Sequence, residues 1–208
     1  MNAYYDPTRN EMVFPSGALA PQTFDANADD AANYGALGGS WAGHELTHGF
    51  DDEGRHFDAK GNLRDWWTPT DSAHFTQEAQ KVVDQFDGYI QIDTFHVNGK
   101  LTLGENIADY GGTLTAYDAL QRALQRNGRP GPIDGFTPEQ RFFLGYAQSW
   151  RSHSRPESMR TRVGIDPHAP ERWRTNGPLS NMPIFATAFG CKPGDPMVRD
   201  PSLVPHIW

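Results

Sequence analysis

The sequence has a single cysteine, Cys191, among its 208 residues. One cysteine cannot form a disulfide within the chain, so it excludes a disulfide framework and a zinc cluster built from several cysteines. Long hydrophobic runs are also missing, because the longest apolar stretch, around residues 182–191, is far shorter than the roughly 20 residues that span a bilayer. We therefore expect no membrane segment in this chain.

Positive charge is scarce as well. Lys and Arg number 18 against 26 Asp and Glu, which gives a formal net charge of −8, and no long basic run stands out. Nucleic-acid binding depends on basic side chains that neutralise phosphates, so no nucleic-acid partner is expected. By contrast, hydrophobic residues make up 37% and aromatic residues 12%, which is enough to build a core.

Apolar periodicity and capping residues predict a mainly helical domain with a small β portion, of the α+β class, over residues 1–208. The expected elements are a hairpin formed by residues 3–5 and 11–14, and helices over about residues 25–50, 70–90, 103–126 and 137–150. After residue 151 frequent prolines predict short elements. No internal repeat or linker divides the chain, and no signal peptide is visible at its start.

The strongest chemical signal is the run of residues 44–48, which reads HELTH. On a helix His44 and His48 lie on one face, one turn apart, so two imidazoles can reach the same metal ion. Glu45 lies about 100° round the helix, where it can reach a water at the metal without ligating the metal itself. Asp51 and Asp52 follow at the helix end and are expected to hydrogen-bond near His48.

A catalytic zinc needs three protein ligands and one open position. Glu105 and Asp109 are also spaced i and i+4, near the start of the helix predicted from residue 103. Either carboxylate can ligate while the other accepts a hydrogen bond from a ligand imidazole. Two acids at this spacing usually form a solvated helix face, but together with the two histidines they predict a His2Glu metal site.

These motifs together resemble the neprilysin and endothelin-converting-enzyme family of zinc endopeptidases. The stretches that carry the resemblance are residues 43–52 (GHELTHGFDD), 65–68 (DWWT), 104–109 (GENIAD), 111–112 (GG), 2–5 (NAYY), 13–15 (VFP) and the final Trp208. They occur in the same order as in the family and cover essentially the whole chain. The resemblance implies a thermolysin-like zincin catalytic domain that forms the C-terminal part of a longer enzyme.

The resemblance also implies how the metal is held. It assigns His44, His48 and Glu105 as the ligands of one zinc ion per chain. Glu45 is then the general base that activates the water. Asp109 orients His44 from behind. The implied activity is hydrolysis of peptide bonds in oligopeptides, with peptides as the substrates.

Five further residues match substrate-binding or catalytic positions of the family. Asn2 and the backbone at Ala3 match the position that holds the substrate main chain in an extended pose. His168 matches the histidine that stabilises the tetrahedral intermediate. Arg174 matches the arginine that binds a substrate carbonyl, and Trp150 matches an aromatic in the wall of the S1′ pocket.

The sequence departs from the family at two places. Cys191 lacks the partners that cysteines have in many animal relatives, and Trp41 stands where relatives carry a smaller aliphatic residue beside the S1′ pocket. The resemblance further implies an extracytoplasmic enzyme with an N-terminal domain that covers the cleft. Without that domain, the alternative is a fragment that binds zinc but does not catalyse.

Overall fold

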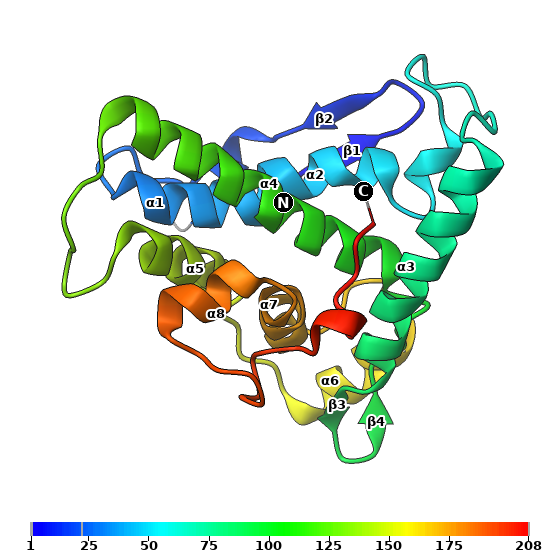
Figure 1. Cartoon of the computed structure of the whole chain (residues 1–208). Coiled ribbons are helices and arrows are strands. Elements are labelled where there is room, and N and C mark those ends of the chain that lie inside the picture. Colours follow the sequence, from blue (N-terminus) through cyan, green and yellow to red (C-terminus); the bar gives the residue numbers. More distant parts are fainter. Residues whose placement is uncertain (1, 22, 208) are drawn as a thin grey trace.

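The computed structural model describes residues 2–21 and 23–207, so the final Trp208 of the resemblance lies outside the described part. It is mainly helical with two small two-stranded sheets, which confirms the predicted fold class (Figure 1). The strands are β1 (Tyr4–Asp6), β2 (Glu11–Val13), β3 (Ile90–Ile92) and β4 (Phe95–His96). The helices are α1 (Asp30–Asn33), a π-helical segment (Tyr34–Gly43), α2 (His44–Thr47), α3 (Pro69–Asp87), α4 (Leu103–Asn127), α5 (Pro138–Ser149), α6 (Pro156–Ile165), α7 (Glu171–Ser180) and α8 (Pro183–Phe189), with short 3-10 turns at Ser16–Leu19, His48–Phe50, Gly54–His56 and Pro201–Leu203.

The N-terminal hairpin forms as predicted. β1 pairs antiparallel with β2, with Tyr4 opposite Val13. In the connecting turn, the carboxylate of Asp6 accepts hydrogen bonds from the backbone N–H and the hydroxyl of Thr8, at 2.9 and 2.6 Å. β1 also contacts α2, so the hairpin lies beside the helix that carries the HELTH motif (Figure 1).

The first long helix starts later than predicted and is wider than an ordinary α-helix. It begins at Asp30, because Asp29 acts as the N-cap and accepts a hydrogen bond from the backbone N–H of Ala32 at 3.2 Å. The π-helical segment then continues into α2 without a break. The apolar spacing of the sequence does not indicate this wider helix, because the segment contains glycines that pack closely against neighbouring backbone. A Cβ added to Gly35, for example, would lie 2.0 Å from the backbone oxygen of Phe142 in α5.

The second predicted helix ends earlier than its apolar pattern suggested. α3 starts after its N-cap, Thr68, and ends at Asp87 with Gly88 as the C-cap. Ile90, which continues the helical spacing in the sequence, lies instead in β3 and pairs with β4. Gly88 weakens the helix, and pairing of Ile90 with His96 in β4 outweighs the helical periodicity.

α4 and α5 match their predicted ranges closely. Gly128, at φ 90°, is the C-cap of α4, and Thr137 and Gln140 form a capping box at the start of α5. α4 runs through the middle of the molecule (Figure 1) and contributes to two hydrophobic clusters, through Leu120 to one and through Ile107 to the other. It is therefore the element against which the site-bearing helices are placed.

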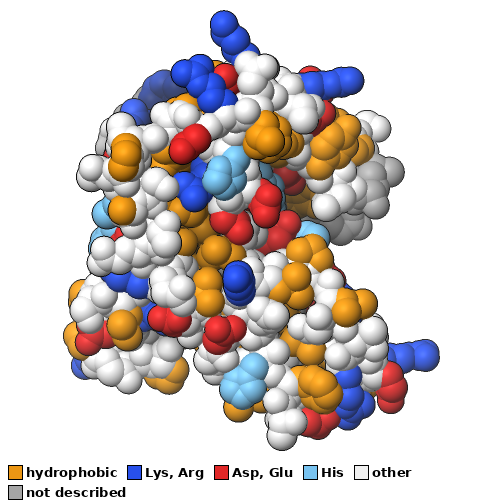
Figure 2. Space-filling view, turned by 90° about the vertical axis from the view of Figure 1, so that its right-hand side faces the viewer, with side chains coloured by type: hydrophobic (Ala, Val, Ile, Leu, Met, Phe, Trp, Pro, Cys, Tyr) orange, Lys and Arg blue, Asp and Glu red, His pale blue; other side chains and the backbone are white. Residues whose placement is uncertain are grey.

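The helices and one face of the surface bear on the expectation of no membrane segment and on the distribution of charge. Within residues 2–21 and 23–207, no helix is long and apolar enough to cross a membrane. Figure 2 shows the face that includes α3, where acidic and histidine side chains gather in a hollow near the middle and basic and apolar side chains are scattered around it.

Candidate metal centre

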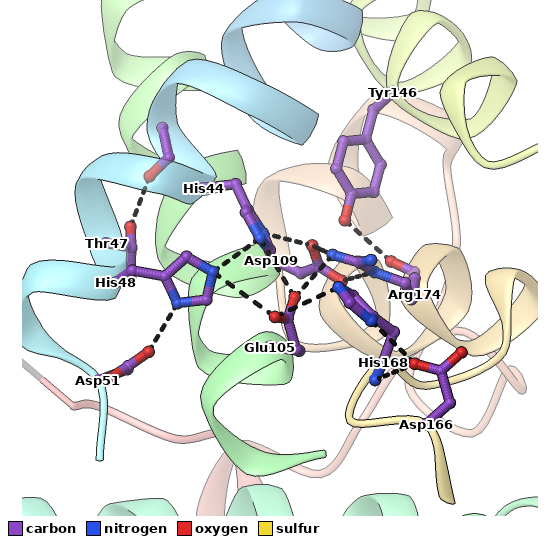
Figure 3. A network of polar contacts seen from close by, with 11 residues as sticks. His44, Thr47, His48, Asp51, Glu105, Asp109, Tyr146, Asp166, His168 and Arg174 are labelled. Carbon is purple, nitrogen blue, oxygen red and sulfur yellow. Dashed lines mark hydrogen bonds and ion pairs between the residues drawn. The ribbon is translucent and has the colours of Figure 1, made fainter. Parts of the chain in front are cut away.

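Packing of α2 against α4 brings the two histidines of the HELTH motif to Glu105. The Nε2 atoms of His44 and His48 lie 3.0 Å apart. Glu105 faces both of them, with Oε2 3.2 Å from Nε2 of His44 and Oε1 3.7 Å from Nε2 of His48 (Figure 3). Two imidazole nitrogens and one carboxylate, all of which can ligate a metal, therefore converge on one point.

Each imidazole is held on its other side by a carboxylate. Nδ1 of His44 lies 2.8 Å from Oδ1 of Asp109, and Nδ1 of His48 lies 2.6 Å from Oδ2 of Asp51. An ionised carboxylate can only accept, so Nδ1 is the donor in both contacts and Nε2 is the atom free to ligate. The contact of Asp51 agrees with the sequence expectation for the end of this helix.

The site favours a positive charge at the point of convergence. Burial opposes protonation of His44, but hydrogen bonds to Asp109 and Glu105 outweigh it and raise the pKa of His44 to about 9. A divalent cation would supply the same charge in place of the proton, because metal ligation requires the neutral imidazole.

The donor set fits zinc. Two imidazole nitrogens and one carboxylate are a ligand set of catalytic zinc sites. Tetrahedral ligands at zinc bond lengths lie roughly 3.3 Å from one another, and the three distances here are 3.0, 3.2 and 3.7 Å. Three protein ligands leave one position of a four-coordinate ion open for reaction.

Glu45 is the second carboxylate close to the histidines. Its carboxylate lies in a group with His44 and His48 whose ligand atoms are all within 4.8 Å of one another. Glu45 is buried, and burial raises its pKa even though both histidines pull it down. Glu105, at 3.2 and 3.7 Å, also faces the two Nε2 atoms, so the structure brings two carboxylates to this centre.

Arg174 lies buried behind the centre, bound to the carboxylate that holds His44. Its Nε and Nη2 donate to the two oxygens of Asp109, both at 2.8 Å, and Nη2 also reaches Glu105 at 3.2 Å. Its guanidinium lies 3.9 Å from the ring centre of Trp150, and its backbone oxygen accepts from the hydroxyl of Tyr146 at 2.8 Å. Burial would raise the pKa of Asp109, but Arg174 and His44 hold it at about 2.

His168 reaches the centre from the loop between α6 and α7. Its Nε2 lies 3.4 Å from Oε1 of Glu105, and its Nδ1 lies 2.9 Å from Oδ1 of Asp166 (Figure 3). Asp166 also accepts the backbone N–H of His168, at 3.0 Å. Asp166 was not among the residues predicted from the sequence, although an aspartate two residues before a loop histidine is a typical turn-forming arrangement that could have indicated it.

The remaining predicted site residues lie on elements that surround the centre. Asn2 is exposed and Ala3 is buried, and both directly precede β1, which contacts α2. Trp150 is the C-cap of α5, and Trp41 is half-buried within the π-helical segment. The structure thus brings His44, Glu45, His48, Glu105, Asp109, His168 and Arg174 together, with Trp150 stacked beneath Arg174.

Sequence relatives and solved structures agree on one family. The chain is 48% identical over 210 residues to an endothelin-converting enzyme homolog of Locusta migratoria and 46% identical over 213 residues to neprilysin-1 of Caenorhabditis elegans. Each match covers 100% of this chain and 28% of the relative. The chain therefore spans less than a third of the length of these relatives.

The fold leads to the same family. A crystal structure of the zinc metalloprotease Zmp1 of Mycobacterium tuberculosis, in complex with an inhibitor, superposes with a TM-score of 0.93 at 44% identity, covering 100% of this chain and 32% of that one. The sequence profile of peptidase family M13 matches residues 2–203. Because this match includes nearly every residue, the chain belongs to peptidase family M13.

Proposed function

We propose that this chain is the catalytic domain of a zinc-dependent endopeptidase that hydrolyses peptide bonds in oligopeptides. The observation that carries the proposal is the convergence of Nε2 of His44, Nε2 of His48 and the carboxylate of Glu105 within 3.0 to 3.7 Å. These three residues would hold one zinc ion. When bound, zinc supplies a Lewis acid that polarises a carbonyl and lowers the pKa of water to about 7.

In the proposed mechanism, Glu45 takes a proton from the attacking water and passes it to the leaving amine. Its burial and its raised pKa suit a group that must both accept and return a proton. Asp109 and Asp51 keep the Nδ1 protons of the two imidazoles in place, at 2.8 and 2.6 Å, so that each Nε2 stays available.

Two cationic or donor groups are proposed to stabilise the negative charge that develops on the substrate oxygen. Nδ1 of His168 donates to Asp166 at 2.9 Å, and in the cationic form of the ring Nε2 carries the second proton and would donate it in a hydrogen bond to the reacting carbonyl. Arg174 uses Nε and Nη2 for Asp109 and Glu105, and its Nη1 has no hydrogen-bond partner in residues 2–21 and 23–207. This nitrogen is the one proposed to bind a substrate carbonyl.

The substrate itself is proposed to lie along the N-terminal hairpin. Asn2 and the backbone of Ala3 would hold its main chain, and Trp150 would form part of the pocket for an apolar residue just after the cut. Trp41 would narrow that pocket. By likeness to its relatives, we also propose that the chain is the C-terminal part of a longer extracytoplasmic enzyme, whose N-terminal domain would be its partner.

The second candidate function is a zinc-binding fold without catalysis. The observation that favours it is that the matched relatives are more than three times as long as the match, since only 28% of each is covered. Residues outside the match can confine the peptide in those relatives. Stoichiometric zinc together with no chelator-sensitive cleavage of any short peptide would favour this second function.

The test of the first function is the substitution Glu45→Gln, which keeps the shape of the side chain and removes its basicity. The variant is expected to retain one zinc per chain and to lose peptide cleavage by at least about 100-fold, as general-base removal does. Glu157→Gln, at an exposed position of α6, is the matched control and should cleave like the parent. Substantial cleavage by Glu45→Gln would overturn the role of Glu45.

A further inference from the structure

A pocket of about 470 Å³ adjoins the candidate metal centre, lined by residues of β3, α5, α6, α7 and the loops between these helices. Two of its lining residues also belong to the centre. Trp150 lies beneath Arg174 at 3.9 Å, and Nε2 of His168 lies 3.4 Å from Glu105. The pocket therefore shares part of its wall with the centre.

The lining is rich in positive charge in a chain that carries a net charge of −8. Its basic side chains are Arg151, His153, Arg162, His168 and Arg172, whereas Glu171 is its single acidic side chain among the described residues. Glu171 accepts from Arg162 at 2.9 Å, and Arg162 also contacts Asp166 at 3.0 Å. Arg162 and Glu171 thus neutralise each other.

Two arginines of the lining remain without an acidic partner. Arg151, just after α5, and Arg172, in the first turn of α7, are exposed, and neither forms an ion pair within residues 2–21 and 23–207. The guanidinium of Arg172 lies 4.6 Å from the ring centre of Trp173, which limits where it can point. Both side chains leave their positive charge available to a ligand.

The rest of the pocket suits a peptide rather than a bare anion. Apolar side chains of Leu144, Ala147 and Met159 line it. Gln91 also lines it and donates to the sulfur of Met159 at 3.5 Å, while its Oε1 is buried and has no hydrogen-bond partner in the described part of the chain. An acceptor of this kind matches a main-chain N–H.

We propose that this pocket binds an acidic residue of the peptide substrate and that Arg151 and Arg172 select for its carboxylate. The inference rests on the proposed function, because the peptide reaches the pocket from the metal centre. The carboxylate can come from an Asp or Glu side chain or from the C-terminus of the peptide. One exposed ion pair contributes up to about fivefold in affinity. With two arginines acting on the same carboxylate we expect a preference of about three- to tenfold, which salt weakens.

The test compares amidated peptides that differ only by Glu in place of Gln, scanned along the sequence on both sides of the cut. For the parent chain, kcat/KM should be about three- to tenfold higher for Glu at one position. Arg151→Gln with Arg172→Gln should bring this ratio close to one. Arg122→Gln, at an exposed arginine that pairs with Asp118 at 2.7 Å on α4, should keep it. A peptide with a free C-terminus distinguishes the two sources of the carboxylate.

A measurement of peptide binding tests the pocket without requiring the chain to cleave the peptide. Fluorescence anisotropy of the labelled peptides on the zinc-loaded Glu45→Gln chain should give the same preference in Kd. If that preference is present while the parent chain cleaves nothing, the proposed endopeptidase activity is wrong and the proposed role of the pocket is supported. Equal Kd values for the Glu and Gln peptides at every position, or a preference that survives the double substitution, would overturn the pocket.

Discussion

At the scale of single residues, the candidate centre is built from imidazoles whose positions are fixed from behind. Asp109 and Asp51 contact the Nδ1 atoms of His44 and His48 at 2.8 and 2.6 Å. Asp109 is itself fixed by two bonds from Arg174 at 2.8 Å. Asp51 is fixed by the backbone N–H groups of residues 53 and 54, which it accepts at 2.9 and 2.7 Å.

Asp51→Asn should weaken zinc binding. Oδ1 of the amide can keep the backbone contacts, but its NH2 group would face Nδ1 of His48, so that two donors oppose each other. Loss of such a supporting carboxylate typically costs about 10- to 100-fold in metal affinity. Competition with a zinc chelator measures this change. Asp118→Asn, exposed on α4, should bind zinc like the parent, and an Asp51→Asn variant that does so too would refute the role of Asp51.

Asp109→Asn should destabilise the metal-free chain, because the buried Arg174 loses the carboxylate that accepts two of its hydrogen bonds and keeps only Glu105, at 3.2 Å, as a counter-charge. Breaking a buried ion pair in this way costs about 3–5 kcal/mol, measured as the free energy of unfolding in denaturant at pH 7. Asp109 has a pKa of about 2 in the folded chain against an ordinary value of 3.8. Its contribution is therefore complete above pH 4 and is lost as the pH falls through 2.

The difference between the parent chain and Asp109→Asn should consequently shrink by about 2 kcal/mol between pH 5 and pH 2. Asp118→Asn, whose carboxylate is exposed, serves as the control and should follow the parent throughout. A difference that stays constant over this range would show that Asp109 does not stabilise the fold through its charge.

The spacing of residues in the sequence predicted much of the site, but not all of it. The i and i+4 histidines predicted a shared metal, and the same spacing left Glu105 and Asp109 interchangeable as the third ligand. Only the three-dimensional packing separates them, because Asp109 lies behind His44 and binds Arg174 while Glu105 faces both Nε2 atoms. Asp166 was not predicted, because it contacts a loop histidine within a turn, and a turn has no periodicity in the sequence.

At the scale of elements, two helices meet at their backbones directly beside the proposed metal ligands. A Cβ added to Gly112 in α4 would lie 2.4 Å from the backbone nitrogen of His44, and one added to Gly43 would lie 2.5 Å from the backbone oxygen of Gly112. No side chain fits between the helices at this point. The contact therefore sets the separation between His44 on α2 and Glu105 on α4.

Gly112→Ala should push these helices apart. Overpacking of this kind costs about 1–3 kcal/mol of stability, and we expect zinc affinity to fall at least tenfold because Glu105 moves away from the histidines. Gly164→Ala is the matched control, since Gly164 lies inside α6 with nothing within 4 Å of an added Cβ. It should stabilise the chain by about 0.5–1 kcal/mol. Parent-like zinc affinity in Gly112→Ala would contradict this account.

An element with a strong local signal in the sequence was predicted correctly, whereas features that depend on contacts between elements were not. α5 was predicted from its capping residues, and the structure contains the complete capping box of Thr137 and Gln140. The π-helical geometry of Tyr34–Gly43 was not predicted, because it depends on contacts with α4 and α5 rather than on local spacing. Ile90 was wrongly predicted to lie in a helix for the same reason, because its pairing with β4 outweighs the helical pattern of the sequence.

At the scale of the whole molecule, the proposed ligands come from segments more than 50 residues apart in the sequence, on either side of the contact between α2 and α4. Both hydrophobic clusters include residues of α4, so the position of Glu105 depends on the complete core. Metal binding and folding should therefore be coupled, as they are wherever a site forms only in the folded state.

The central claim is that His44, His48 and Glu105 hold one zinc ion while Glu45 stays free to act as a base. A crystal structure of the zinc-loaded chain, with an anomalous difference map at the zinc absorption edge, tests it directly. The account predicts one peak per chain, at about 2.0–2.2 Å from Nε2 of both histidines and from the carboxylate of Glu105. A peak ligated by Glu45 in place of Glu105, or no peak at the histidines, would contradict it.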